Sequence, residues 1–258
     1  MSHSHEHINP DRFADSAGTP WAGREFDENP WSNDDGSADP KFIETLAAFR
    51  TGAATNEQVV DVIRKMRLLI PLLADLGEGG EGAHGQTVDK SADLSIVTVA
   101  TPDDQNGLPV FSSVAAMQAW NPTARPVPAD ARRVALAAAS EGNTRIIVDA
   151  QSETEFAIRR PAIEAIATAQ SWVHPVRDER VHAEFASLIE NFEKITAFAL
   201  EDCDETSRLR TAEVQLVLTL EPGLEVEKVQ ALMQEFAQAL SQSSIIAEHV
   251  DSLRVKLA

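Results

Sequence analysis

The sequence contains few cysteines and few basic residues for its length, and it has no long apolar run. Its single cysteine, Cys203, can form neither an internal disulfide nor a thiolate metal cage, so we expect a reducing compartment, the cytoplasm. The 22 Lys and Arg against 41 Asp and Glu give a net charge of −19, the wrong sign for direct binding of nucleic acid through its phosphates. We expect neither membrane insertion nor export, because no apolar segment could span a bilayer and residues 1–13 lack the features of a secretory signal.

Residues 1–40 are predicted to form a largely extended, acidic tail. They carry nine acidic and two basic residues among Gly, Pro, Ser and Asn, a composition that buries too little apolar surface to offset the entropy of ordering. The tail nevertheless holds large aromatic residues, which can dock into a groove. We interpret Trp21, Arg24, Phe26 and Trp31 as candidates for partner binding, and docking on the chain's own folded body is the alternative.

Residues 41–171 are predicted to form an α/β domain with a mixed sheet, because helical and strand patterns alternate along this region. Pro71 would remove a ladder hydrogen bond from its strand, so we expect that strand near a sheet edge. We expect a helix with Asn56 as its N-cap, further helices at residues 41–50, 114–120, 129–141 and 161–169, and strands at residues 68–74, 94–100, 108–111 and 145–149.

Residues 172–258 are predicted to form a second, smaller α/β domain. The irregular stretch WVHPV at residues 172–176 is interpreted as the domain junction. The expected order is α-β-β-α-β, with the helices on one side of a sheet. The helices are expected at residues 178–193 and 226–240, and the strands at residues 195–201, 213–221 and 252–257.

Several segments, taken in order, resemble one known bacterial family. The segments are TPWAGREF (19–26), DDGSADP (34–40), RLLIPLLAD (67–75), VDKSADLSIVTVATPD (88–103), LPVFSSVAAMQAW (108–120), ARPVP (124–128), RIIVDA (145–150) and RRPAIEAIA (159–167). Together they resemble the actinobacterial branch of the SseB family, with an SseB N-terminal domain followed by a C-terminal companion domain. The resemblance implies a cytoplasmic protein without an assigned catalytic residue or cofactor, and it weakly implies a translation-related partner.

Four arginines near the predicted junction are candidates for a small anion site. They are Arg159, Arg160, Arg177 and Arg180. The alternative is that they pair with the abundant carboxylates and form a solvated face.

Other patterns point less clearly to chemistry. His3, His5 and His7 are weak metal-site candidates, because a mobile histidine tract lacks the outer groups that orient metal ligands. The glycines of residues 77–82 fit the GxGxxG spelling, but no helix is expected after them, so we predict no bound cofactor. Cys203 is flanked by carboxylates, which favour its unreactive thiol form.

These observations predict a non-enzymatic protein-interaction or regulatory module. No catalytic residue is assigned, and the expected partner is a protein of unspecified identity. The alternative is a small-ligand-binding protein or an enzyme whose site lies at the domain junction. The sequence specifies no oligomeric state.

Overall fold

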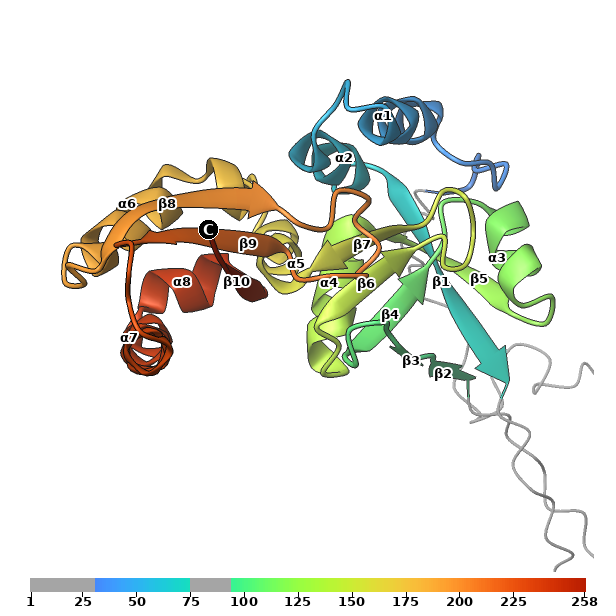
Figure 1. Ribbon diagram of the computed structural model, residues 1–258. Helices are drawn as coiled ribbons and strands as arrows, with labels where there is room; N and C mark the ends of the chain where they lie inside the picture. Colours follow the sequence, from blue (N-terminus) through green and yellow to red (C-terminus); the bar gives the residue numbers. More distant parts are fainter. Residues whose placement is uncertain (1–30, 75–93) are drawn as a thin grey trace, which may run out of the picture. The chain divides into compact units, whose positions relative to one another are not determined.

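The computed structural model describes residues 31–74 and 94–258, and it confirms the predicted mixed α/β fold (Figure 1). By their contacts, residues 1–35 and residues 36–258 form separate units, and every element described below belongs to the second unit. None of the helices in the described residues has the length and apolarity that a membrane crossing requires.

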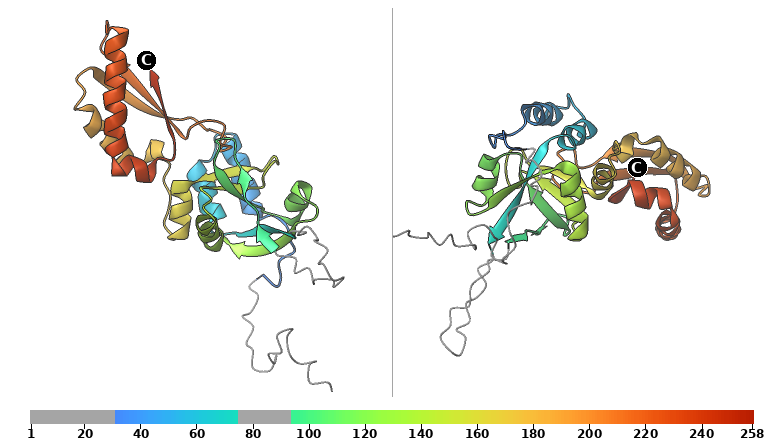
Figure 2. Two further views of the ribbon diagram at one scale, coloured as in Figure 1. Left: turned by 90° about the horizontal axis from the view of Figure 1, so that it is seen from below. Right: turned by 180° about the vertical axis from the view of Figure 1, so that it is seen from behind.

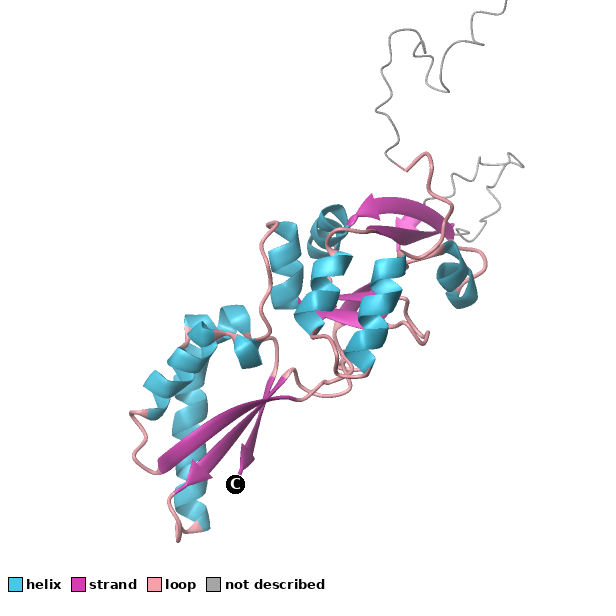
Figure 3. Ribbon diagram, turned by 90° about the horizontal axis from the view of Figure 1, so that it is seen from above, coloured by secondary structure: helices cyan, strands magenta, loops and turns pink. Residues whose placement is uncertain are grey.

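Helices and strands alternate along the chain up to residue 167, as Figure 3 shows by colour. The helices are α1 (Pro40–Arg50), α2 (Asn56–Ile63), α3 (Val114–Trp120), α4 (Ala131–Ser140) and α5 (Arg160–Ala167). The strands are β1 (Arg67–Ala74), β2 (Leu94–Ile96), β3 (Val99–Ala100), β4 (Asn106–Val110), β5 (Arg125–Asp130), β6 (Arg145–Val148) and β7 (Phe156–Arg159).

These strands form two sheets. One has the order β3-β4-β6-β7, in which β4 and β6 are parallel and the other pairs are antiparallel. The other has the order β2-β1-β5 and is antiparallel throughout. A single bridge between Leu69 of β1 and Phe111 links the two sheets.

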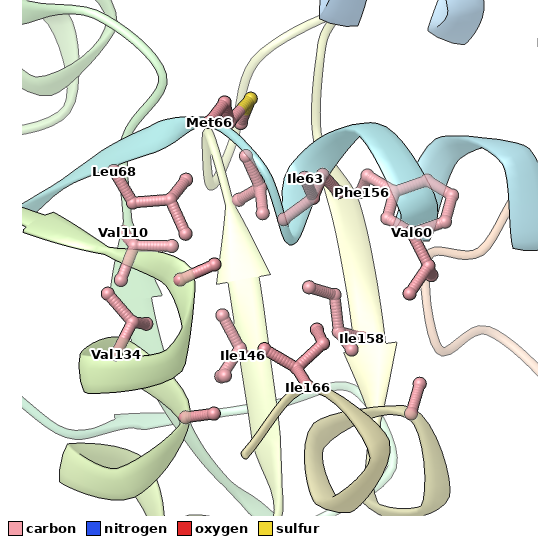
Figure 4. Packing of buried hydrophobic residues seen from close by; sticks show 14 of the residues in the cluster. Val60, Ile63, Met66, Leu68, Val110, Val134, Ile146, Phe156, Ile158 and Ile166 are labelled. Atoms are coloured by element: carbon pink, nitrogen blue, oxygen red, sulfur yellow. The ribbon is translucent and has the colours of Figure 1, made fainter. Parts of the chain in front are cut away.

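The main core lies on one face of the β3-β4-β6-β7 sheet. Side chains that alternate along its strands, such as Val110, Ile146 and Ile158, pack against α1, α2, α4 and α5 in one hydrophobic cluster (Figure 4). The opposite face is covered differently: Ile147 and Leu209 join a small separate cluster there, and Leu209 belongs to a loop far along the chain. That loop becomes important for the candidate site.

From residue 175 onward the chain builds a third sheet with its own hydrophobic cluster. Its order is β10-β9-β8, with β8 antiparallel and β10 parallel to β9. Leu216 and Leu218 share one face of β9 and pack with Phe185, Phe236 and Ile246 of the three helices, which Figure 2 shows beside the strands. The elements are α6 (Glu179–Ile189), β8 (Ile195–Asp202), β9 (Val214–Leu220), α7 (Val226–Gln242), α8 (Ser244–His249) and β10 (Leu253–Leu257). The predicted domain division at residue 172 stays a prediction.

Pro71 lies in the middle strand of its sheet, so the predicted edge position is wrong. β1 pairs with β5 along its first part, and with β2 only from Leu72 onward. Leu69 exchanges both backbone hydrogen bonds with Phe111, at 2.8 and 2.9 Å. N–H groups alternate in direction along a strand, so the N–H that Pro71 lacks would point to the same side as the N–H of Leu69. On that side, position 71 falls between the bridge to Phe111 and the start of the pairing with β2, where β1 has no partner strand. The proline therefore costs the sheet no hydrogen bond.

Several other local predictions were wrong. The expected strand at residues 94–100 is two short strands in different sheets, and no side chain from Ile96 to Ala100 is fully buried. The N-cap of α2 is Thr55 instead of Asn56, because Thr55 and Gln58 form a reciprocal capping box. The strands β5 and β7 and the helix α8 were not predicted. Their segments are short, and β5 contains two prolines.

The segment 108–120 has the predicted order of strand, cap and helix. Ser113 caps α3 by accepting a hydrogen bond from the Ala116 N–H at 3.1 Å. Met117 is fully buried, and the Trp120 ring lies 5.3 Å from the Phe111 ring, centroid to centroid. This packing fixes the loop at the carboxyl end of β4.

Candidate functional site

Two arginines on neighbouring strands, Arg145 of β6 and Arg159 of β7, form the centre of a buried ionic network. They face each other in the sheet register and are 5% and 7% exposed. Arg145 donates to both carboxylate oxygens of Asp251 at 2.8 Å and to Asp103 at 2.9 Å. Arg159 donates to Asp204 at 2.7 Å and to Asp251 at 3.1 Å. The network therefore joins the β6–β7 pair to segments from the last third of the chain.

Both terminal nitrogens of Arg159 donate within this network. Its guanidinium also donates to the Ser252 Oγ at 3.0 Å and to the Thr211 carbonyl at 2.9 Å. Burial alone would lower the pKa of Arg159, but the hydrogen bond and charge of Asp204 outweigh it and raise the pKa. Arg159 therefore stays charged, and its charge is matched by carboxylates of the same chain.

A small cavity lies beside the network, between Trp172 and Glu213. It leaves about 20 Å³ of room for a water-sized sphere, enough for about one water molecule. Glu213 is 2% exposed, and one of its oxygens accepts the Asp251 N–H at 2.8 Å. Its other oxygen and the Trp172 Nε1 have no hydrogen-bond partner among the described residues. Burial raises the pKa of Glu213 to about 8, so the side chain is neutral near pH 7.

His174 lines the same cavity and is held in its neutral form. Burial, and then the nearby charge of Arg177, lower its pKa to about 4. Its Nδ1 accepts the Val176 N–H at 3.3 Å, which leaves the proton on Nε2, 3.7 Å from Asp202.

Glu57 accepts two hydrogen bonds from Arg177 at 2.7 Å and the His174 N–H at 3.0 Å. Burial opposes ionisation of Glu57, but these bonds hold its pKa at about 2.

Each of the four arginines predicted as anion-site candidates binds a carboxylate of the same chain. Anion binding by these arginines stays a prediction, and it would require another anion to replace a carboxylate. The pairs are Arg159 with Asp204 and Asp251, Arg160 with Glu164, Arg177 with Glu57, and Arg180 with Asp178.

Asp149 ties together the loops that follow the parallel strands β4 and β6. Its fully buried carboxylate accepts the Ser112 N–H and the Ser112 hydroxyl, both at 2.7 Å, and the Thr154 hydroxyl at 2.8 Å. Burial raises the pKa of Asp149 despite these bonds. The carboxyl ends of parallel strands are where α/β proteins commonly bind ligands. The loops after β4 and β6 are therefore held in place at an end of the sheet where a ligand could bind.

The structure assembles three other arginines around an open pocket next to these loops. We call it the arginine pocket; its volume is about 590 Å³. Arg50 ends α1, whereas the other two arginines lie in the loop between β8 and β9. The residues that line the pocket are Arg50, Gln151, Ser152, Glu153, Thr206, Arg208 and Arg210.

The arginine pocket differs from the ionic network in what its guanidinium groups bind. Arg50 donates to the carbonyl oxygens of Thr206 and of Glu155, the latter at 2.5 Å. Arg208 donates to the carbonyls of residues 152 and 153 at 3.1 and 3.0 Å, and its Nε lies 3.9 Å from the Glu155 carboxylate. Arg210 is exposed and has no ion-pair or hydrogen-bond partner in the part of the chain that the structure describes. Carbonyl oxygens carry no net charge, so the positive charge of the pocket is only partly compensated.

The loop that carries Arg208 and Arg210 is positioned by the ionic network. Asp204, which binds Arg159, also accepts the N–H groups of Arg208 at 3.3 Å and Leu209 at 2.8 Å. Ser207 and Leu209 adopt φ angles of 48° and 58°, a conformation that costs energy for residues other than glycine. The same carboxylate therefore serves the network and shapes the pocket.

Sequence reasoning did not find the arginine pocket. The one local signal is the pair of arginines in SRLRT, residues 207–211, which follows an acid-rich stretch. Arg50 lies more than 150 residues away, and only its bond to the Thr206 carbonyl reveals that it belongs to the same site.

The remaining predicted site residues add little to this picture. Trp21, Arg24, Phe26, the three N-terminal histidines His3, His5 and His7, and the glycines of residues 77–82 lie outside the described residues. Trp31 is partly buried, and its carbonyl accepts the Asp34 N–H at 3.1 Å. Cys203 is partly buried, and its N–H donates to the Glu213 carbonyl at 3.1 Å. Within residues 31–74 and 94–258, no three His, Cys, Asp or Glu side chains are arranged to hold a metal ion.

The fold and these contacts define a mixed α/β protein in which the two buried arginines are matched by carboxylates of the same chain and three other arginines line an open pocket. Residues 43–165 match the family described as the SseB protein N-terminal domain, a span from within α1 to within α5. The match covers just under half of the chain and shows that this region is similar to an SseB N-terminal domain. Comparison with curated proteins and comparison with solved structures each found no match.

Proposed function

We propose that this SseB-like protein is a non-enzymatic interaction or regulatory module that binds a protein partner. The observation that carries the proposal is that the charged groups of the junction, where the alternative function would place a ligand site, are already bonded within the chain. An open pocket of about 550 Å³ lies there, and the network residues that line it, Asp103, Arg145 and Asp251, are paired with one another. Arg145 and Arg159 are bonded to carboxylates of the same chain, and the neighbouring cavity has room for about one water molecule. A substrate site needs a larger space with converging polar groups.

The titratable groups beside this cavity also favour a structural role. Glu213 is neutral near pH 7 because burial raises its pKa to about 8, and one of its oxygens already accepts a backbone N–H. The Nδ1 of His174 is engaged by the Val176 N–H, and the pKa of His174 is lowered to about 4 by burial. Neither group is a free base facing a substrate-sized space.

Partner binding would use the acidic tail and the exposed surface. Trp21, Phe26 and Trp31 are the aromatic anchors that we assign to the partner, with Arg24 beside them. The net charge of −19 suits a partner with a basic surface. We propose that the encounter takes place in the cytoplasm, and the weak family implication makes a translation-related partner a first candidate.

A pull-down from an extract of the native cell tests this function. The full chain is compared with a chain that lacks residues 1–35 and with a full-length chain carrying Trp21→Ala, Phe26→Ala and Trp31→Ala, which keeps the charge of the tail. We expect both altered chains to lose a partner that the full chain captures. Identical partner sets for all three chains would remove the role assigned to the tail.

The alternative function has its own test. A ligand that binds only the folded chain raises its melting temperature, so a metabolite panel is screened against the full chain. A metabolite that stabilises the full chain but not a Glu213→Gln variant would favour a ligand site at the junction over the proposed interaction module.

A further inference from the structure

We propose that the arginine pocket binds a phosphate dianion, presented by a phosphorylated side chain of the partner protein. The pocket itself indicates that the ligand is a phosphate. That the phosphate is carried by a partner protein rests on the proposed function. The pocket lies between the end of α1, the loop after β6 and the loop between β8 and β9.

The first argument is positive charge that is only partly compensated. Arg50 and Arg208 are held by carbonyl oxygens, and burial followed by the proximity of Arg208 lowers the pKa of Arg50. Two like charges are therefore held close together, with Arg210 beside them on the same pocket wall. A dianion would relieve this repulsion.

The second argument is the donor geometry. Guanidinium groups offer planar pairs of N–H donors that match phosphate oxygens. Every N–H of Arg210 is available within the described residues, and Arg208 uses only its Nη2 for its bonds to carbonyl groups. The pocket volume of about 590 Å³ exceeds that of a phosphate group alone, so a phosphate attached to a larger molecule also fits.

The third argument is that the pocket is built before a ligand arrives. Asp204 holds the backbone of the arginine loop, Leu209 anchors that loop in a hydrophobic cluster, and Asp149 holds the facing loop through Ser112 and Thr154. Binding to such a site loses little energy to ordering.

Two carboxylates at the pocket oppose an anion and provide a further test. Glu155 accepts the Gln151 N–H at 2.7 Å and lies 3.9 Å from Arg208, so it is partly occupied. Glu153 lines the pocket, and its carboxylate is engaged in no bond among the described residues. Neutralising Glu153 should therefore strengthen phosphate binding.

The experiment is a calorimetric titration of the full chain at low salt. The probes are inorganic phosphate, a seven-residue Gly/Ala peptide with one central phosphoserine, and the same peptide with serine. The variants are Arg210→Gln, Glu153→Gln and the control Arg133→Gln, because Arg133 is also an exposed arginine and lies on α4, outside the pocket. Circular dichroism and urea unfolding verify that each variant is folded.

We expect both phosphate probes to bind the unaltered chain and the Arg133→Gln control alike. Arg210→Gln should bind about tenfold more weakly, as expected for the loss of a charge-assisted bond, and Glu153→Gln should bind more tightly. Binding should weaken at pH 5, where the phosphoserine is a monoanion. Equal affinity for the unaltered chain and Arg210→Gln, or no binding at millimolar phosphate, would overturn the site.

The source of the phosphate is decided separately. Tighter binding of the phosphopeptide than of inorganic phosphate supports a protein source, and equal binding overturns that part. A partner captured by the pull-down but held equally well by Arg210→Gln would reject the phosphate site and leave the interaction function intact.

Discussion

The ionic network and the arginine pocket use the same residue type for different purposes. In the network, Arg145 and Arg159 are buried and bind Asp103, Asp204 and Asp251. In the pocket, the guanidinium groups are more accessible and bind carbonyl oxygens or, for Arg210, no group in the described residues. The groups that bind the guanidinium, and not the position of the arginine in the sequence, indicate whether the arginine stabilises the fold or is available to bind a ligand.

We expect a substitution in the ionic network to lower the free energy of unfolding much more than one in the arginine pocket. Replacing Arg159 by Met leaves the buried Asp204 without its cation, so we expect the free energy of unfolding to fall by about 3–5 kcal/mol. Urea unfolding measures the loss. Arg180→Met is the control. Arg180 pairs with Asp178 but its side chain is largely exposed, so its loss should lower the free energy of unfolding by at most about 1 kcal/mol. Similar losses for both variants would mean that the buried network is not the stronger element.

The second prediction concerns pH and Glu213. Its pKa is raised from 4.5 to about 8 in the folded chain, so between these values the folded state binds more protons than the unfolded state. Stability from this group is therefore full below about pH 4.5 and declines as the pH rises toward 8, by about 1 kcal/mol per pH unit. Glu213→Gln cannot ionise, so the stability difference between this variant and the unaltered chain should shift in favour of the variant as the pH rises.

Urea unfolding at pH 5, 6, 7 and 8 checks that shift. His174, whose pKa is lowered to about 4, acts in the opposite direction: its contribution is lost as the pH falls from 6.5 through 4, and it is present in both chains. Parallel stability curves for the two chains over this range would contradict a buried, neutral Glu213.

A smaller effect is expected at the edge of the arginine pocket. Arg208→Gln removes the bonds to the carbonyls of residues 152 and 153, so the free energy of unfolding should fall by about 1–2 kcal/mol. The measurement is again urea unfolding, with the midpoint compared at a constant slope. A loss as large as that of Arg159→Met would place Arg208 in the structural class instead.

The smallest effect is expected at Arg210. This side chain is exposed and unpartnered within the described residues, so Arg210→Gln should change the free energy of unfolding by less than about 0.5 kcal/mol. The same variant should bind phosphate about tenfold more weakly, which separates stability from recognition in one substitution. A clear loss of stability would show that Arg210 supports the loop and is unsuited to a recognition role.

Much of the fold is predictable from the sequence because local signals agree with the final packing. The helix 114–120 has its serine cap and its buried Met117, and the alternation of residues 215–220 marks β9. Predictions failed where tertiary contacts override local preference. Pro71 fits a central strand only because its missing donor faces the gap beyond the bridge to Phe111, a fact that no window of the sequence contains.

The candidate site was less predictable for a related reason. Arg159 was identified as a notable arginine, but its partners Asp204 and Asp251 lie 45 and 92 residues further along the chain. The arginine pocket joins Arg50 to Arg208, and nothing in either local segment refers to the other. The excess of acidic residues predicts that most arginines pair with carboxylates, but it does not identify the arginines that lack such a partner.

The shared carboxylates of the network also constrain how this protein can change in evolution. Arg145 and Arg159 lie inside the segment that matches the SseB N-terminal domain, whereas Asp204 and Asp251 lie outside it. A relative that lost or exchanged its C-terminal region while keeping both arginines would leave Arg159 without a carboxylate partner and Arg145 with Asp103 alone. Positions 145 and 159 should therefore covary with positions 204 and 251, and SseB domains joined to a different second region should carry apolar residues at the two arginine positions.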